Sequence, residues 1–306
     1  MSIVRNTLFV SALSLALAAC GNETTQPDGE RGAPELPDPV TMQMDLGFFA
    51  DDAARAVAGG ADLGDGAALS GGAAHSDGAA LSGGGTALGS AGANAHWNWI
   101  AAVVHVTALN LIVGEVLGPP SAAFHLALTA EPEKVDRNTY LWEYVFDDGD
   151  ERVAVDLEGS WVSGGVDWSL YVTGIIEGRE LDHDLWYRGH SSQGGRTGYW
   201  IFSDLEADPT DVARLDWSRS LAETELSLSI IDSGHEDFGD HIAYSRTGTV
   251  RRVEWSDQSE EQLFFVTWDV VTGAGSLEVP EYNDGDRACW NTEQEDIDCP
   301  DDEVSL

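Results

Sequence analysis

The chain has 306 residues and is strongly acidic, with 54 acidic against 15 basic residues and a formal net charge of −39. Because nucleic-acid binding needs basic patches that contact phosphate, this charge argues against a nucleic-acid partner. Hydrophobic residues make up 42% of the chain and eleven residues are tryptophan, which is ample for a folded core.

The N-terminus has the pattern of a cleavable export signal. Arg5 supplies a positive charge, and an apolar run of twelve residues follows from Leu8 to Ala19. This run is shorter than the roughly 20 residues of a membrane-spanning helix, but it fits a secretory signal. The stretch Leu17-Ala18-Ala19-Cys20 closely resembles the lipobox of bacterial lipoproteins.

The lipobox resemblance implies that the signal is cut before Cys20 and that this cysteine carries the lipid. In that family the thiol receives a diacylglycerol and the new amino group is acylated, as with palmitate. The negative charge disfavours attraction to anionic lipid, so we expect the acyl chains to supply the membrane affinity. Gly21 replaces the Asp that commonly retains lipoproteins at the inner membrane, which favours an outer-membrane location in the cell envelope.

Composition predicts three parts along the chain: a signal peptide at 1–19, a tether at 20–93 and a folded domain at 94–306. The tether is rich in Pro, Gly, Ala and Ser, and the motif DGAALSGG occurs in it twice, at 65–72 and 77–84. Segments of this composition form flexible coils.

The folded domain opens with an apolar helix. Residues Asn94–Gly114 carry no charged side chain, and Gly118-Pro119-Pro120 is expected to end the helix. A membrane span is one interpretation, and a helix buried in the domain's own core is the other. Polar residues dispersed along the run are costly in hydrocarbon and favour the buried helix. Its apolar residues cover most of the circumference, which predicts burial on most sides.

After the proline pair, apolar and polar residues alternate with a period of two, interrupted by Gly- and Asp-rich turns. This pattern predicts about ten consecutive antiparallel strands. We therefore expect a mainly β fold: an antiparallel meander that curls into a barrel or half-barrel, with the long apolar helix packed on or in it. The expected strands are 140–146, 153–157, 166–173, 185–188, 199–203, 213–219, 226–231, 242–246, 251–255 and 263–269.

The C-terminal part contains the two cysteines that remain after Cys20. An even pair in an oxidising compartment predicts a disulfide between Cys289 and Cys299, within a tail, 282–306, that we expect to be irregular. The order of apolar helix, Pro-Pro, strand meander and a late Cys-Trp followed by one more Cys loosely resembles uncharacterised lipoproteins of myxobacterial type. That resemblance implies no activity.

The sequence contains no complete catalytic or metal-binding motif. The run Gly189–Gly194 has Gln193 where the G-x-S-x-G nucleophile elbow requires glycine, and the acidic stretch 232–241 matches no known metal-ligand spacing. Carboxylates are so abundant that candidate acid–base pairs carry no information. We therefore predict a protein that is not an enzyme and needs no cofactor or metal.

Aromatic residues in the strands give the one hint of a ligand. Aromatic walls suit apolar ligands, so a curved sheet lined by them is expected to bind an apolar or amphiphilic molecule. A surface module for carbohydrate or protein is the alternative, and a hydrolase is the third possibility. The expected lining residues are Tyr140, Trp142, Tyr144, Trp168, Trp186, Trp200 and Trp217.

Overall fold

The computed structural model describes residues 31–49, 96–147, 152–176, 179–192, 194–205, 210–259, 261–280 and 282–300. The predicted signal peptide, Cys20 and the repeated DGAALSGG motif lie outside the described residues.

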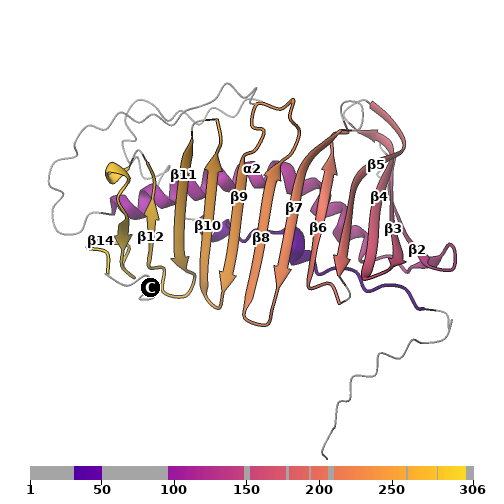
Figure 1. Cartoon of the computed structure of the whole chain (residues 1–306), viewed down its shortest axis with the longest axis horizontal. Coiled ribbons are helices and arrows are strands. Elements are labelled where there is room, and N and C mark those ends of the chain that lie inside the picture. The colour runs from indigo at the N-terminus through magenta and orange to yellow at the C-terminus, as the bar shows by residue number, and fades with distance from the viewer. Residues whose placement is uncertain are drawn as a thin grey trace, which may run out of the picture. The chain divides into compact units, whose positions relative to one another are not determined.

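Strands dominate the fold and form a single antiparallel sheet, in which each strand pairs with its neighbours in sequence (Figure 1). The strand order runs from β1 to β14 without a crossover and without closure, so the sheet is a half-barrel. All ten predicted strands are present, and the predicted meander is confirmed. They are β2 (Thr139–Asp147), β3 (Arg152–Val162), β4 (Gly165–Ile176), β5 (Arg179–Ser192), β6 (Thr197–Ser203), β7 (Asp211–Arg219), β8 (Glu223–Ile230), β9 (His241–Thr247), β10 (Val250–Asp257) and β11 (Gln262–Asp269).

Four shorter strands, which the sequence did not predict, complete the sheet at its two ends. β1 (Glu133–Lys134) precedes β2, and β12 (Gly275–Glu278), β13 (Ala288–Trp290) and β14 (Asp296–Ile297) follow β11. Both edge strands have two residues. Short edge strands offer few backbone groups to another chain, which limits edge-to-edge association.

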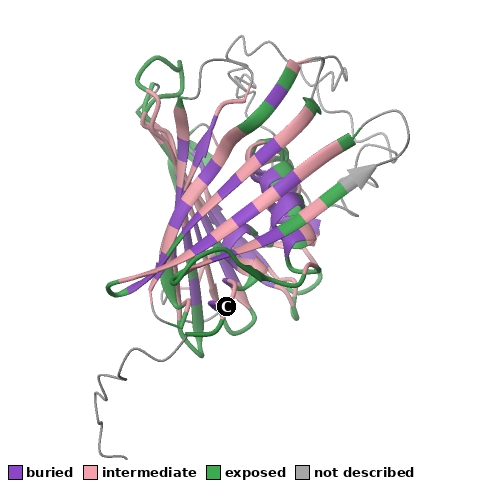
Figure 2. Ribbon diagram, turned by 90° about the vertical axis from the view of Figure 1, so that its right-hand side faces the viewer, coloured by how far each residue is buried: buried purple, intermediate pink, exposed green. Residues whose placement is uncertain are grey.

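One long helix, α2 (Trp97–Ala127), crosses the sheet on one face, which we call the inner face (Figure 1). Its ends contact opposite ends of the sheet, β12–β14 at one end and β2 and β3 at the other. Buried residues alternate along the strands, and α2 carries both buried and exposed residues (Figure 2). The period of two therefore gives each strand one apolar side, which packs beneath the helix.

The helix differs from the prediction in its end and in its burial. It continues through Pro119 and Pro120 to Ala127, although interior prolines remove backbone donors and typically cost about 3 kcal/mol. Beyond the prolines, buried Ala123, Phe124 and Ala127 pack into the core, and this burial offsets the cost.

Burial on most sides of the helix was also a wrong prediction. Twelve of its residues are buried, but Trp97, Val104, Leu111 and Ile112 are exposed. By length and composition alone the helix could cross a membrane, yet here one of its sides is packed on the sheet.

Residues 31–49, which we assigned to the flexible tether, pack instead on the inner face beside α2. This segment includes two short 3-10 helices, η1 (Pro39–Met42) and η2 (Gly47–Phe49). The Phe49 ring lies 4.8 Å from Trp99 of α2 and 5.2 Å from Trp268 of β11. In this segment Met42, Leu46 and Phe49 are as buried as the core residues of the sheet. The folded unit therefore begins near Ala33 rather than at residue 94.

The C-terminal residues form a clasp at the N-terminal end of α2, rather than the irregular tail we expected. The predicted disulfide is confirmed: Cys289 of β13 is bonded to Cys299. Between them, Asp296 of β14 accepts hydrogen bonds from the backbone N–H groups of Trp97 (3.2 Å) and Asn98 (2.9 Å). These N–H groups belong to the first helical turn, which has no partners within the helix, so Asp296 caps α2 across 198 residues of sequence.

The side chain of Asn98 joins the same clasp to the rest of the tail. Its Nδ2 donates to the Cys289 carbonyl at 2.7 Å, and its Oδ1 accepts from the Tyr282 hydroxyl at 2.7 Å. Burial, together with the charge of Asp296, raises the pKa of Tyr282 to about 12. The hydroxyl therefore remains a hydrogen-bond donor throughout the physiological pH range.

Core tryptophans lie over glycines of adjacent strands. The clearest pair is Gly198 of β6 and Trp217 of β7, which are opposite each other in the ladder. A Cβ atom at Gly198 would come within 2.5 Å of the Trp217 ring. Three further pairs have the same arrangement: Gly159 with Trp168, Gly189 with Trp200, and Gly275 with Trp290. Glycine thus lets each indole lie close to the sheet, which makes room for α2 above it.

We predict that Gly198→Ala lowers the free energy of unfolding by about 1–3 kcal/mol, because the added methyl group displaces the Trp217 ring. Gly114→Ala is the control: this helix position is exposed and has no atom within 4 Å of an added Cβ. Alanine favours a helix over glycine by up to about 1 kcal/mol, so this variant should be as stable as the parent or more so. Urea unfolding followed by tryptophan fluorescence measures the free energy of unfolding of both variants and of the parent. Equal stability of the two variants would contradict the close fit.

A second prediction concerns the clasp. Asp296→Ala should cost about 0.5–2 kcal/mol of stability, because it removes the cap from two N–H groups of α2. Asp298→Ala removes the same charge from an exposed neighbour and should change stability little. Thermal unfolding followed by circular dichroism distinguishes the two. A loss of similar size in both variants would mean that charge, and not capping, is responsible.

Candidate functional site

The structure places most of the predicted ligand-lining residues inside the core. Tyr140, Trp142, Trp168, Trp200 and Trp217 are buried, with at most 7% of each exposed. The other two are half-buried, Tyr144 on β2 and Trp186 beside an irregularity in the β4–β5 pairing.

These buried rings contact one another and the helix. The Trp142 and Trp168 centroids are 5.8 Å apart, and Trp200 stacks on Trp217 at 5.3 Å. Phe124 of α2 lies 5.7 Å from Trp200. The Trp168 indole N–H is also satisfied internally, since it donates to the Ser191 hydroxyl at 2.9 Å. The space between α2 and these strands is therefore occupied by protein side chains.

A hollow of about 460 Å³ lies on the opposite side of the sheet, the outer face, across β7–β10. We call it the outer groove. Its floor is made by Ser227, Ala243 and Ser245, whose short side chains leave room between longer neighbours on the adjoining strands. The side chains that line it on the outer face are Asp216, Ser218, Glu225, Ser227, His241, Ala243, Ser245, Arg252 and Glu254.

Most residues that line the outer groove are polar, although more of its accessible surface is apolar than polar, and several of these side chains are held by their neighbours. The His241 Nε2 atom lies 2.8 Å from the Ser227 hydroxyl. At one rim, Arg214 holds Asp216 through two hydrogen bonds, of 2.7 and 2.6 Å, and lies 4.3 Å over the Tyr199 ring. Hydrogen bonding to Asp216 raises the pKa of Arg214. Hydrogen bonds therefore hold Asp216, the Ser218–Glu225 pair and the Ser227–His241 pair in place around the groove.

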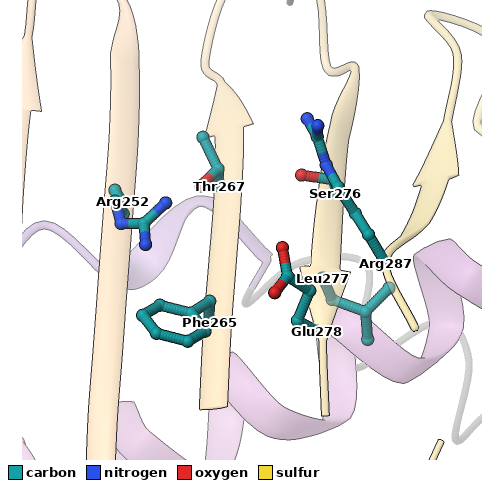
Figure 3. Close-up of a pocket in the computed structure, with 7 residues that line it drawn as sticks. All are labelled: Arg252, Phe265, Thr267, Ser276, Leu277, Glu278 and Arg287. Carbon is teal, nitrogen blue, oxygen red and sulfur yellow. The ribbon is translucent and has the colours of Figure 1, made fainter. Parts of the chain in front are cut away.

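A second, smaller hollow of about 90 Å³ lies beside the first on the outer face, and Arg252 lines both. The Arg252 guanidinium lies 4.6 Å over the Phe265 ring. The small hollow is lined by Arg252, Phe265, Thr267, Ser276, Leu277, Glu278 and Arg287 (Figure 3). The two hollows together extend over the outer face from β7 to β13.

The motifs considered for chemistry do not form a catalytic or metal site in the described residues. Residues Gly189–Ser192 belong to strand β5 and not to a nucleophile elbow. The acidic stretch 232–241 forms a loop that satisfies itself, with Asp232 accepting from the Gly234 N–H at 2.8 Å. Within the described ranges, no three His, Cys, Asp or Glu side chains lie close enough together to hold a metal ion.

Sequence reasoning overlooked the outer groove, although a signal for it was present. On β8 and β9 four neighbouring outward positions are occupied by short side chains, Ser227, Ser229, Ala243 and Ser245, between the longer Glu225 and His241. A run of short outward residues on adjacent strands predicts a depression, but only once the strand register is known.

No protein-family model, curated protein or solved structure matches this chain.

Proposed function

We propose that this protein is a lipid-anchored protein of the bacterial cell envelope, which binds a hydroxyl-rich ligand in the outer groove and catalyses nothing. By its chemistry the ligand is an oligosaccharide. The observation that carries this proposal is the outer groove itself: about 460 Å³, floored by small residues and edged by carboxylates and hydroxyls, of which Asp216 and Glu225 are held by hydrogen bonds.

Polar lining of this kind matches the hydroxyl groups of a sugar, which both donate and accept hydrogen bonds. Glu225 and Glu254 can accept, Arg252 can donate, and Ser245 can do both. An apolar ligand between α2 and the sheet has less support, since side chains of the predicted lining residues occupy that space. The surface-module alternative therefore fits the geometry better than the carrier.

The lipobox at Cys20 supports the proposed attachment to a membrane, and Gly21 supports the outer membrane as its location. The strong negative charge would help to keep such a surface-bound domain soluble.

The ligand proposal predicts that Ala243→Trp, which fills the groove floor, weakens oligosaccharide binding at least about tenfold, the equivalent of 1.4 kcal/mol. Ser169→Trp makes the matched small-to-large change on the outer face of β4, outside the groove, and should leave binding unchanged. A glycan array with the full-length protein identifies the ligand, and calorimetry compares the variants. Equal binding by both variants, or an array without a bound glycan, would contradict the proposal.

The anchor proposal predicts that Cys20→Ser abolishes incorporation of labelled palmitate and releases the protein from the membrane fraction. The physical reason is the loss of the thiol that accepts the diacylglycerol. Labelling and fractionation of this variant against the parent measure both effects. Membrane retention that survives the substitution would show that something other than the acyl chains holds the protein.

A further inference from the structure

The exposed side of α2 is apolar over its N-terminal half, up to the exposed Glu115. Trp97, Val104 and Leu111 recur every seven residues and so lie on one side of the helix, and Ile112 is next to them. Their exposed fractions are 41%, 37%, 64% and 40%. We call these four residues the α2 stripe.

The helix has almost no charge. Glu115 is the single acidic residue among the 31 residues of α2, which contain no lysine or arginine. What distinguishes these four residues from other exposed apolar residues of the chain is that they lie together on one side of a helix, and such a patch is a candidate interaction site.

We infer that the α2 stripe rests on the surface of the lipid bilayer, with the helix parallel to the membrane. This inference deepens the proposed function, because it depends on the lipid anchor at Cys20. The stripe runs from residue 97 to residue 112, about 22 Å at 1.5 Å per residue, which gives it an extended line of contact. Its other side is packed on the sheet, so it would lie on the membrane rather than cross it.

The length of the chain before the folded unit supports the bilayer as the partner. Ten residues separate Cys20 from Arg31, so the two lie at most about 40 Å apart along the chain. The chain then packs on the inner face, where Gln43 contacts Ser121 of α2 at 3.5 Å. The chain from a lipid anchor would therefore enter the folded unit on the side of the sheet that carries α2.

The stripe itself carries no charged residue, and the exposed carboxylates of Asp38, Asp45 and Glu115 lie elsewhere on the α2 side of the sheet. Trp97 stands at one end of the stripe, and tryptophan favours the interface between lipid and water.

The test uses the full-length lipoprotein in phosphatidylcholine vesicles. Leu111→Cys is labelled with an environment-sensitive fluorophore, NBD, and compared with Leu263→Cys, an exposed leucine on β11 of the sheet. The introduced thiol is the reactive one, because Cys289 and Cys299 are bonded and Cys20 would be acylated. We expect a blue-shifted emission, at least about twofold brighter, at position 111 and quenching by a spin label on the lipid chains. Position 263 should keep the emission of a label in water.

Three results would overturn the inference. The first is a label at 111 that emits as in water while the protein is bound to vesicles. The second is a blue shift that arises without vesicles and increases with protein concentration, which would identify a second copy as the partner. The third is equal quenching at both positions.

A failure of the anchor is separable from a failure of the stripe. The mass of the N-terminal peptide reports acylation of Cys20 independently of fluorescence. Should Leu111→Cys unfold the protein, quenching of the native tryptophans by spin-labelled lipid, compared between the parent and Trp97→Phe, tests the same contact. No difference between those two proteins would then count against it.

Discussion

The close contact between indole rings and cross-strand glycines is the constraint on which the rest of this structure depends. A long helix can lie across a curved sheet only if the sheet side chains form a layer of even height. Large rings at Trp168, Trp200 and Trp217 supply apolar area, while Gly159, Gly189 and Gly198 let them lie close to the strands. The core therefore buries a large apolar area within a thin layer of side chains, and α2 packs directly on that layer.

This packing has a consequence for function. Because the rings and α2 fill the inner side, the aromatic residues that suggested a ligand cavity act as structural core. The two surfaces that we propose for binding, the outer groove and the exposed side of α2, are ones that the core does not use. The same strands form the core on the inner face and line the groove on the outer face, because alternate residues such as Trp217 and Ser218 point to opposite faces.

The strands were predictable because a period of two appears directly in the sequence. The error at Pro119-Pro120 arose because local propensity was overridden by tertiary burial of Phe124 and its neighbours. Residues 31–49 could have been recognised, since Val40, Met42, Met44, Leu46 and Phe48 alternate with other residues in a way no flexible tether requires. The cap that Asp296 provides could not have been recognised from the sequence, because nothing local distinguishes that carboxylate from the other acidic residues. The outer groove depends on register between strands, which composition does not reveal.

The clasp connects these observations to the compartment proposed for the protein. Neither His96 nor any other local side chain caps the described start of α2, so the helix depends on Asp296 from the far end of the chain. β14, which carries Asp296, has two residues and pairs only with β13, and so small a strand contributes little stability of its own. The Cys289–Cys299 bond holds that strand in place. A disulfide persists in the oxidising cell envelope and not in a reducing cytosol, so the position of α2 is coupled to export. The side of the molecule that we assign to the membrane is therefore completed in the compartment where the membrane contact would be made.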